Sequence, residues 1–457
     1  MGRGGPDCFG SYDIRGRLSA GFDAAICRRI GRGFARVMEP GSVVVGRDIR
    51  PSSPGLQAAL IAGLRDEGCD VIDLGLCATE EVYFATGHLG AGGGLMVTAS
   101  HNPADWNGIK LVGPGARPVA GDSGLDAIRD LVAADGFGPA RAQGRLWQET
   151  PRAAYAARVA GFLETGGLGP LTILVNAGHG VAGPAFDAVA ALIGQAGVPW
   201  RFERINHDPD GSFPAGIPNP LLPENRPATA RAVVAAGADL GIAWDGDGDR
   251  CFLFDAQGGF VDGEHVVALL AQAFLARHPG ARIVHDPRVI WNTVDAVARG
   301  GGVAVPCRTG HAHMKAKMRE ADAVYGGEMS AHHYFRDFLY CDSGIIPAIL
   351  VAGLVARSGR GLAGLVGEMR AQFPSSGEIN FAIADKAAAM ARVEAVFGPQ
   401  ARGADRLDGL SLDLGDWRLN LRASNTEDLL RLNLETRGDR ALLAAKVAEV
   451  SALLSAG

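Results

Sequence analysis

The stretch that decides the fold is residues 42–75, SVVVGRDIRPSSPGLQAALIAGLRDEGCDVIDLG. Its first part, 42–46, is a short continuous apolar run, which is typical of a buried strand. Leucines then recur every four residues between 55 and 67, as on one face of a helix, and a second apolar run follows at 70–75. Strand, helix and strand in this order predict two parallel strands joined by a crossover helix.

This strand–helix–strand unit recurs at 171–203 and again at 281–305. Three such units predict three related α/β domains with mixed, largely parallel sheets. Beyond about residue 370 the pattern changes to alternating strands and a final helix over 440–454, which predicts a C-terminal α+β domain. Because 457 residues exceed what one core holds, we expect four domains around a central cleft, with boundaries 1–148, 149–254, 255–370 and 371–457.

The composition excludes several classes of protein. A hydrophobic share of 47% with 21% charged residues is ordinary for a globular chain, and no run of about 18 uncharged apolar residues predicts a membrane span. A net charge of −6 gives no reason to expect nucleic acid or anionic membranes as partners. Seven scattered cysteines without a CxxC pair indicate reduced thiols. We therefore expect a cytoplasmic protein, a monomer or weak dimer, that acts on small molecules.

A serine follows the apolar run 94–97, in the sequence TASHNP at 98–103. A hydroxyl in a tight turn at the end of a strand lies at the rim of a sheet, where it can accept and donate a group if a neighbour activates it. Most loop serines only bind backbone or water, so Ser100 depends on what the rest of the chain supplies.

A second motif, DGDGDR at 245–250, follows the apolar run 240–244. Three carboxylates at alternate positions, separated by glycines, can converge on one hard divalent cation. The alternative is a calcium loop of the EF-hand type, but that loop needs a glutamate at its twelfth position, where this chain has Ala256, and a helix before it. The spacing therefore predicts a magnesium site.

Two weaker motifs come later in the chain. In 326–333, GGEMSAHH, a carboxylate and a hydroxyl two residues apart in an extended loop would point the same way and suit two neighbouring sugar hydroxyls, although Glu328 could instead be a structural cap. In 422–428, RASNTED, a guanidinium with short polar side chains between two strands forms the kind of turn that binds phosphate. The alternative there is an ordinary polar hairpin.

With these four motifs in this order, the chain resembles the α-D-phosphohexomutase superfamily, most of all its bacterial phosphomannomutase and phosphoglucomutase members. The resemblance runs nearly end to end, and it includes the segments FGSYDIRG at 9–16, VGRDIR at 45–50, NGIK at 107–110 and GIPNPLLPEN at 216–225. It implies reversible conversion of mannose 6-phosphate and mannose 1-phosphate, and of the glucose pair, through a phosphoserine enzyme and a hexose 1,6-bisphosphate, which supplies sugar nucleotides for polysaccharide synthesis.

The resemblance also implies the roles of individual residues. Ser100 carries the phosphoryl group, and its phosphate oxygen joins Asp245, Asp247 and Asp249 in holding Mg²⁺. Three residues act on the transferring phosphoryl group: His101, Arg250 and the acid–base partner Lys110. The residues that bind the substrate are Tyr12, Arg15, His311, Glu328, Ser330, Arg422, Ser424, Asn425 and Thr426.

Two departures from the family pattern and several alternatives stand beside this interpretation. Asp428 occupies a place that is often proline, where its charge would weaken an anion site, and Arg288 and Arg308 replace lysines and cannot act as bases. The alternatives are a phosphoglucomutase as the main activity, a magnesium-dependent phosphatase that passes through phosphoserine, and a silent sugar-phosphate binder. The sequence of the 328–333 loop disfavours phosphoglucosamine as substrate.

Overall fold

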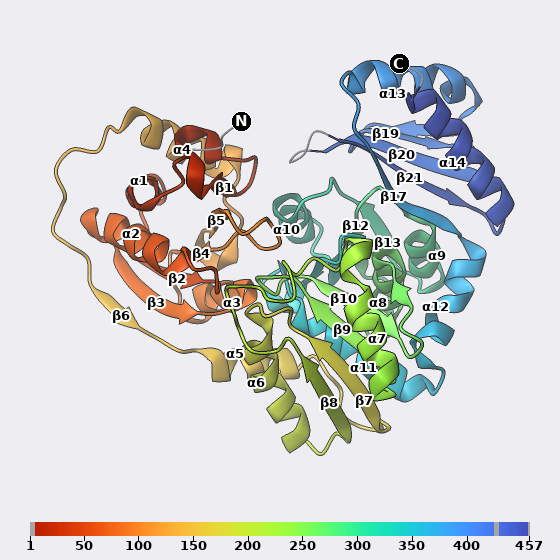
Figure 1. Cartoon of the computed structure of the whole chain (residues 1–457), viewed down its shortest axis with the longest axis horizontal. Coiled ribbons are helices and arrows are strands. Elements are labelled where there is room, and N and C mark those ends of the chain that lie inside the picture. The colour runs from red at the N-terminus through yellow and green to blue at the C-terminus, as the bar shows by residue number, and fades with distance from the viewer. Residues whose placement is uncertain (1–4, 425–428, 456–457) are drawn as a thin grey trace. The chain divides into compact units, whose positions relative to one another are not determined.

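The structure is a computed structural model that describes residues 5–424 and 429–455 (Figure 1). It contains two compact units, one formed by Met1–Phe260 with His332–Leu362 and the other by Val261–Ala331 with Ala363–Gly457. Each unit is built from two segments of the chain.

The first unit begins with a six-stranded sheet. Its strand order is β1-β5-β4-β2-β3-β6. Strands β4, β2, β3 and β6 are parallel, and β5 is antiparallel to both of its neighbours, β4 and β1. The strands are β1 (Ile14–Arg17), β2 (Ser42–Arg47), β3 (Asp70–Leu76), β4 (Gly93–Val97), β5 (Trp106–Val112) and β6 (Leu146–Gln148), and the helices of this part are α1 (Ala24–Met38), α2 (Ser53–Asp66), α3 (Thr79–His88) and α4 (Leu125–Ala134).

Helices α1 and α2 cross where each carries a glycine. A Cβ on Gly31 would lie 2.3 Å from the Leu60 carbonyl oxygen, and one on Gly63 would lie 2.0 Å from that of Arg28. Only glycine lets the two backbones approach this closely, so the pair anchors the hydrophobic core over the parallel strands.

A second sheet of the first unit has the order β11-β10-β9-β7-β8. Strands β8, β7 and β9 are parallel, β10 is antiparallel to β9, and β8 lies at the edge. The elements are α5 (Arg152–Ala160), β7 (Leu171–Asn176), α6 (Ala182–Gln195), β8 (Trp200–Ile205), α7 (Pro227–Ala236), β9 (Leu240–Trp244), β10 (Cys251–Asp255) and β11 (Phe260–Val261). The segment 332–362 of the same unit contains β15 (His333–Phe335) and β16 (Cys341–Asp342), an antiparallel pair outside this sheet, and helix α11 (Ile345–Ser358).

The second unit combines parallel strands with an antiparallel sheet. Strand β12 pairs in parallel with β13 and β14, whereas the C-terminal sheet, of order β17-β21-β20-β19-β18, is antiparallel throughout. Its elements are α8 (Gly263–Arg277), β12 (Arg282–His285), α9 (Trp291–Arg299), β13 (Val303–Pro306), α10 (His311–Glu320), β14 (Tyr325–Gly327), α12 (Gly361–Gln372), β17 (Ser375–Phe381), α13 (Lys386–Phe397), β18 (Gly403–Asp405), β19 (Leu410–Asp413), β20 (Trp417–Ala423), β21 (Leu430–Thr436) and α14 (Arg440–Ser455).

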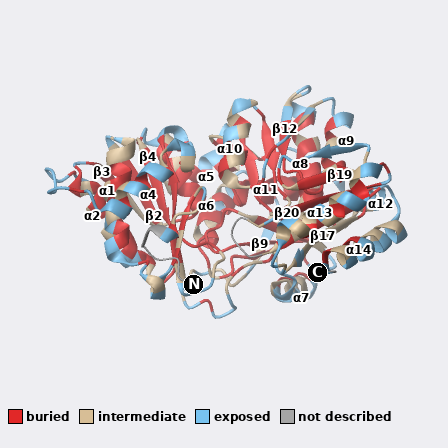
Figure 2. Cartoon of the chain, turned by 90° about the horizontal axis from the view of Figure 1, so that it is seen from above, coloured by how far each residue is buried: buried red, intermediate tan, exposed pale blue. Residues whose placement is uncertain are grey.

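The predicted fold class is confirmed: α/β domains with mixed, largely parallel sheets are followed by an α+β domain. Buried residues gather along the strands and the inner helix faces (Figure 2). Among the described residues, no single helix has the length and hydropathy of a membrane span, and only α11 and α12 taken together pass that test.

Candidate active site

Ser100 lies in a tight turn directly after β4. Its φ of 51° is left-handed, a conformation that is uncommon for a residue with a side chain and often found where function requires it. Its backbone N–H donates to Thr98 Oγ1 at 2.8 Å. The buried Arg50 guanidinium donates to four carbonyl oxygens between residues 100 and 106, at 2.6 to 3.0 Å, and so ties the whole turn together.

The Ser100 hydroxyl is 1% exposed and contacts two ionisable side chains. Its Oγ donates to Asp245 Oδ2 at 2.7 Å and lies 2.9 Å from His101 Nδ1. Burial, with the neighbouring Asp249 and Asp247, raises the pKa of Asp245 to about 7. Burial and nearby cations such as Arg250 lower the pKa of His101 well below its usual value, so its imidazole is neutral.

Three buried carboxylates lie beside this hydroxyl. One oxygen from each of Asp245, Asp247 and Asp249 lies within 4.8 Å of the others. Asp247 Oδ1 and Asp249 Oδ1 are buried, and no described residue donates a hydrogen bond to either. A buried carboxylate oxygen without a partner is costly, and an all-oxygen donor set suits a hard divalent cation. These residues therefore fit a metal such as Mg²⁺.

Lys110, on β5, provides the positive charge of this cluster. Its Nζ donates to Asp247 Oδ2 at 2.6 Å and also contacts Asp249 Oδ2. Burial alone would lower the pKa of Lys110, but Asp247 and Asp249 outweigh it and raise that pKa above its usual value. Thr79 Oγ1 donates to the same Asp247 oxygen at 2.7 Å, so the aspartate is held by β5 and by the first residue of α3.

Arg250 is oriented by His332, a residue of the 326–333 motif to which the sequence had suggested no role. Arg250 Nε donates to His332 Nε2 at 3.0 Å, and His332 Nδ1 lies 3.2 Å from Asp342 Oδ2. Because a guanidinium only donates, Nε2 is the accepting nitrogen and Nδ1 carries the proton. Arg250 Nε also lies 3.6 Å from Asp245 Oδ2, the oxygen that accepts from the Ser100 hydroxyl. The arginine that was predicted to stabilise charge therefore lies beside this hydrogen bond.

Of the two predicted residues near the N-terminus, Arg15 reaches the serine turn. Its Nε donates to Asp13 at 2.8 Å, its NH1 donates to the Ala99 carbonyl at 3.2 Å, and it also contacts Asn102 Oδ1. Tyr12 is half-buried in the segment before β1.

In the second unit, Glu328 and Ser330 share a turn and an arginine. The expectation of an extended loop is wrong here, because the Ala331 N–H donates to the Glu328 carbonyl at 3.0 Å and closes a turn. Both side chains nevertheless face Arg288, whose NH2 lies 3.4 Å from Ser330 Oγ and 4.0 Å from Glu328 Oε1. Glu328 Oε1 also accepts from the Gly310 N–H at 2.9 Å, just before His311 begins α10.

Three arginines of the second unit share one carboxylate. Arg288, Arg422 and Arg431 lie 3.5, 3.5 and 3.2 Å from Glu378. Burial and the neighbouring Arg288 lower the pKa of Arg422. Sequence reasoning missed Arg431 and Glu378. The hairpin spacing could have revealed Arg431, since it pairs directly with Arg422 across β20 and β21.

The remaining predicted phosphate ligands follow Arg422. Ser424 is half-buried, and its N–H donates to the Leu429 carbonyl at 2.9 Å. Asn425, Thr426 and Asp428, the residue that differs from the family pattern, lie outside the described residues. Arg308, the other lysine replacement, is exposed.

Similar proteins match this chain over nearly its whole length. It is 55% identical over 446 residues to the phosphohexose mutases of Xanthomonas campestris, covering 98% of each chain. It is 53% identical over 450 residues to the phosphomannomutase of Salmonella montevideo, covering 98% of this chain and 99% of the relative. A crystal structure of a phosphoglucomutase/phosphomannomutase family protein from Burkholderia thailandensis superposes with a TM-score of 0.88 at 31% identity, covering 99% of this chain and 98% of that one.

The four domains described for phosphoglucomutase/phosphomannomutase also match in order. They are α/β/α domain I at 6–138, domain II at 153–259, domain III at 262–373 and the C-terminal domain at 378–453. The fold and the buried serine with its carboxylates define a phosphoryl-transferring isomerase. The chain belongs to the phosphoglucomutase/phosphomannomutase family, which confirms the predicted superfamily.

Proposed function

We propose that this chain is a phosphomannomutase that interconverts mannose 6-phosphate and mannose 1-phosphate, and also the two glucose phosphates. The observation that carries the proposal is Ser100 Oγ, held by a left-handed turn 2.7 Å from Asp245. Relatives at 45 to 53% identity named phosphomannomutase support the mannose substrate. They do not favour a phosphatase or a phosphoglucomutase as the main activity.

In the proposed reaction, phosphorylated Ser100 gives its group to the free hydroxyl of the sugar. The bond between phosphorus and Oγ breaks, a bond from phosphorus to the sugar oxygen forms, and the hydroxyl proton ends on Oγ. Lys110 and His101 are the groups that we propose relay this proton, since one is an ammonium in the acidic cluster and the other a neutral imidazole beside Oγ.

The same residues then accept the other phosphate of the hexose 1,6-bisphosphate. Asp245, Asp247 and Asp249 would hold Mg²⁺ together with an oxygen of the phosphorylated serine, and the cation supplies compensation of the negative charge on the moving group. Arg250, kept in place by His332, adds a fixed positive charge that costs no reorganisation during transfer.

The second unit supplies the chemistry for the end of the substrate that does not react. Arg422, with Ser424, Asn425 and Thr426, would bind the unreactive phosphate, because guanidinium groups match phosphate oxygens in pairs. Glu328 and Ser330 would bind the hydroxyls on carbons 3 and 4. These exchange places when the bisphosphate turns round, whereas mannose and glucose differ at carbon 2.

We also propose His311, Tyr12 and Arg15 as substrate contacts. The four domain boundaries given above and a cytoplasmic location are part of the same proposal.

The test is turnover of mannose 1-phosphate and glucose 1-phosphate side by side, with and without hexose 1,6-bisphosphate. Isomer formation that needs the bisphosphate and Mg²⁺, with mannose preferred, is expected. Ser100→Ala should abolish turnover and the phosphate that mass spectrometry finds on that peptide. The exposed Ser212→Ala should change neither. Release of free phosphate without isomer would overturn the proposal.

A further inference from the structure

Strand β8 leaves one edge of the second sheet open. In the described part of the chain the strand order ends at β8, which pairs on one side with β7 alone. The Pro199 carbonyl accepts from the Leu171 N–H of β7. Because successive residues of a strand direct their backbone groups to opposite sides, the Trp200 C=O and the N–H and C=O of Phe202 and Arg204 point outward. The Trp200 N–H instead donates to the Val198 carbonyl at 2.9 Å.

A side-chain hydrogen bond shows that the Phe202 carbonyl points away from β7. Arg204 NH1 donates to the Phe202 carbonyl at 3.0 Å, so a side chain occupies an acceptor that a neighbouring strand would otherwise use. The outward groups that remain, the Trp200 C=O, the Phe202 N–H and those of Arg204, are a template for one more strand. Natural edges are often blocked by charges, and what matters is therefore how the charges of β8 are arranged.

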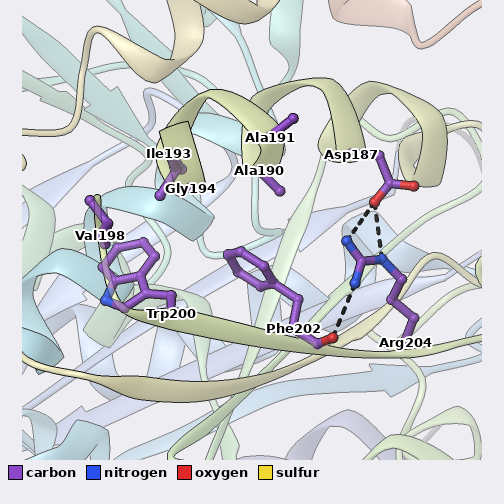
Figure 3. Close-up of a pocket in the computed structure, with 9 residues that line it drawn as sticks. All are labelled: Asp187, Ala190, Ala191, Ile193, Gly194, Val198, Trp200, Phe202 and Arg204. Carbon is purple, nitrogen blue, oxygen red and sulfur yellow. Dashed lines mark hydrogen bonds and ion pairs between the residues drawn. The ribbon is translucent and has the colours of Figure 1, made fainter. Parts of the chain in front are cut away.

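A shallow groove of about 330 Å³ runs beside this edge (Figure 3). Trp200, Phe202 and Arg204 rise from β8 towards α6, which contributes the small residues Ala190, Ala191 and Gly194. Both aromatic rings are only partly buried. The groove thus offers apolar surface on the face of the sheet that carries the side chains of Trp200, Phe202 and Arg204.

The other face of β8 carries opposite charges in alternation. Arg201 and Glu203 have side chains 68% and 44% exposed and lie 3.3 Å apart. Their intrastrand contact is solvent-exposed and weak, so both charges are available to a partner.

We propose that this edge pairs with the same edge of a second copy of the chain, as antiparallel β8 strands related by a two-fold axis through Phe202. Outward backbone groups permit only registers that set an even-numbered residue opposite an even-numbered one. With Phe202 on the axis, Arg201 meets Glu203 of the partner subunit and Glu203 meets the partner's Arg201.

That register also sets aromatic against aromatic and cation against aromatic. Phe202 faces its own counterpart, and Trp200 meets the partner's Arg204, a cation–π pair. Moving the axis to Arg201 puts two arginines face to face, and moving it to Glu203 does the same to two glutamates. Charge complementarity therefore selects one register and one occupant, a second copy.

The test reverses the charges singly and in combination. Sedimentation velocity over about a hundredfold range of concentration should show a monomer–dimer equilibrium for the unmodified chain. Arg201→Glu or Glu203→Arg alone places like charges opposite each other twice in each dimer, and should weaken association by about tenfold or more. An equal mixture of the two variants restores both ion pairs and should associate as a heterodimer. The double variant restores them between identical copies and should associate as a homodimer.

The exposed Arg231→Glu on α7 of the same domain is the matched control and should leave association unchanged. Mutase activity and thermal unfolding of every variant report whether the fold is intact, because none of these residues belongs to the proposed active site. A chain that stays monomeric throughout would overturn the proposal. So would association that ignores the charge reversals, or single variants that fail to associate when mixed.

Discussion

Replacing Gly246 by alanine is expected to slow turnover about a hundredfold while the protein stays folded. Gly246 lies between two of the proposed metal ligands, and a Cβ at this position would stand 2.6 Å from the Ser100 carbonyl oxygen. Ordinary van der Waals contact begins at 3.4 Å, so the aspartate loop and the serine turn would have to separate by about 0.8 Å. Arg50 ties the serine turn to its neighbours, and the aspartate loop therefore takes up most of the shift.

A displacement approaching 1 Å between reacting groups costs on the order of 10²-fold in rate. The overpacking itself should cost about 1–3 kcal/mol of stability. The assay compares kcat for mannose 1-phosphate with thermal unfolding. Gly55→Ala is the control, because nothing lies within 4 Å of a Cβ there. A Gly246→Ala enzyme with nearly unchanged kcat, or an equal loss in the control, would refute the reasoning.

Three further predictions concern the metal, the anion site and pH. Chelation should stop turnover and Mg²⁺ should restore it, with Asp249→Asn raising the Mg²⁺ concentration needed by about ten- to a hundredfold, as measured by Mg²⁺ titration of activity. Glu378→Gln removes the carboxylate that Arg422 and its neighbours share, so inorganic phosphate should inhibit about tenfold more tightly in competition kinetics. Burial, with the adjacent His332, lowers the pKa of His333 to about 3, so the unfolded chain binds the proton first as pH falls below about 6.5. Urea unfolding should show about 2 kcal/mol lost between about pH 7 and pH 5, a loss absent from His333→Gln.

Each of these has a control. Asp239→Asn, an exposed residue at the opposite end of β9 from the aspartate loop, should leave the Mg²⁺ requirement unchanged. Glu394→Gln on α13 should leave phosphate inhibition unchanged. The exposed His88→Gln should keep the loss of stability at low pH. Unaltered phosphate inhibition in Glu378→Gln, or a pH profile of His333→Gln identical to that of the unmodified chain, would contradict the corresponding argument.

The sequence by itself determined the elements and the two decisive loops. The apolar run at 42–46 is the core of β2, and that at 240–244 is β9. A buried strand needs a continuous apolar run, and the polar residues that follow must lie where it ends. For this reason Ser100 and Asp245 could be placed at strand ends before any tertiary contact was known.

Only the tertiary structure decided which charged groups meet. Lys110 contacts Asp247 from 137 residues away, Thr79 from 168, and Arg250 finds its partner in His332. Glu328 and Ser330 come together through a turn and Arg288 rather than through an extended strand. Periodicity records whether a side chain faces the core, but a long-range ion pair depends on how separate strands and loops are packed, and no local pattern carries that information.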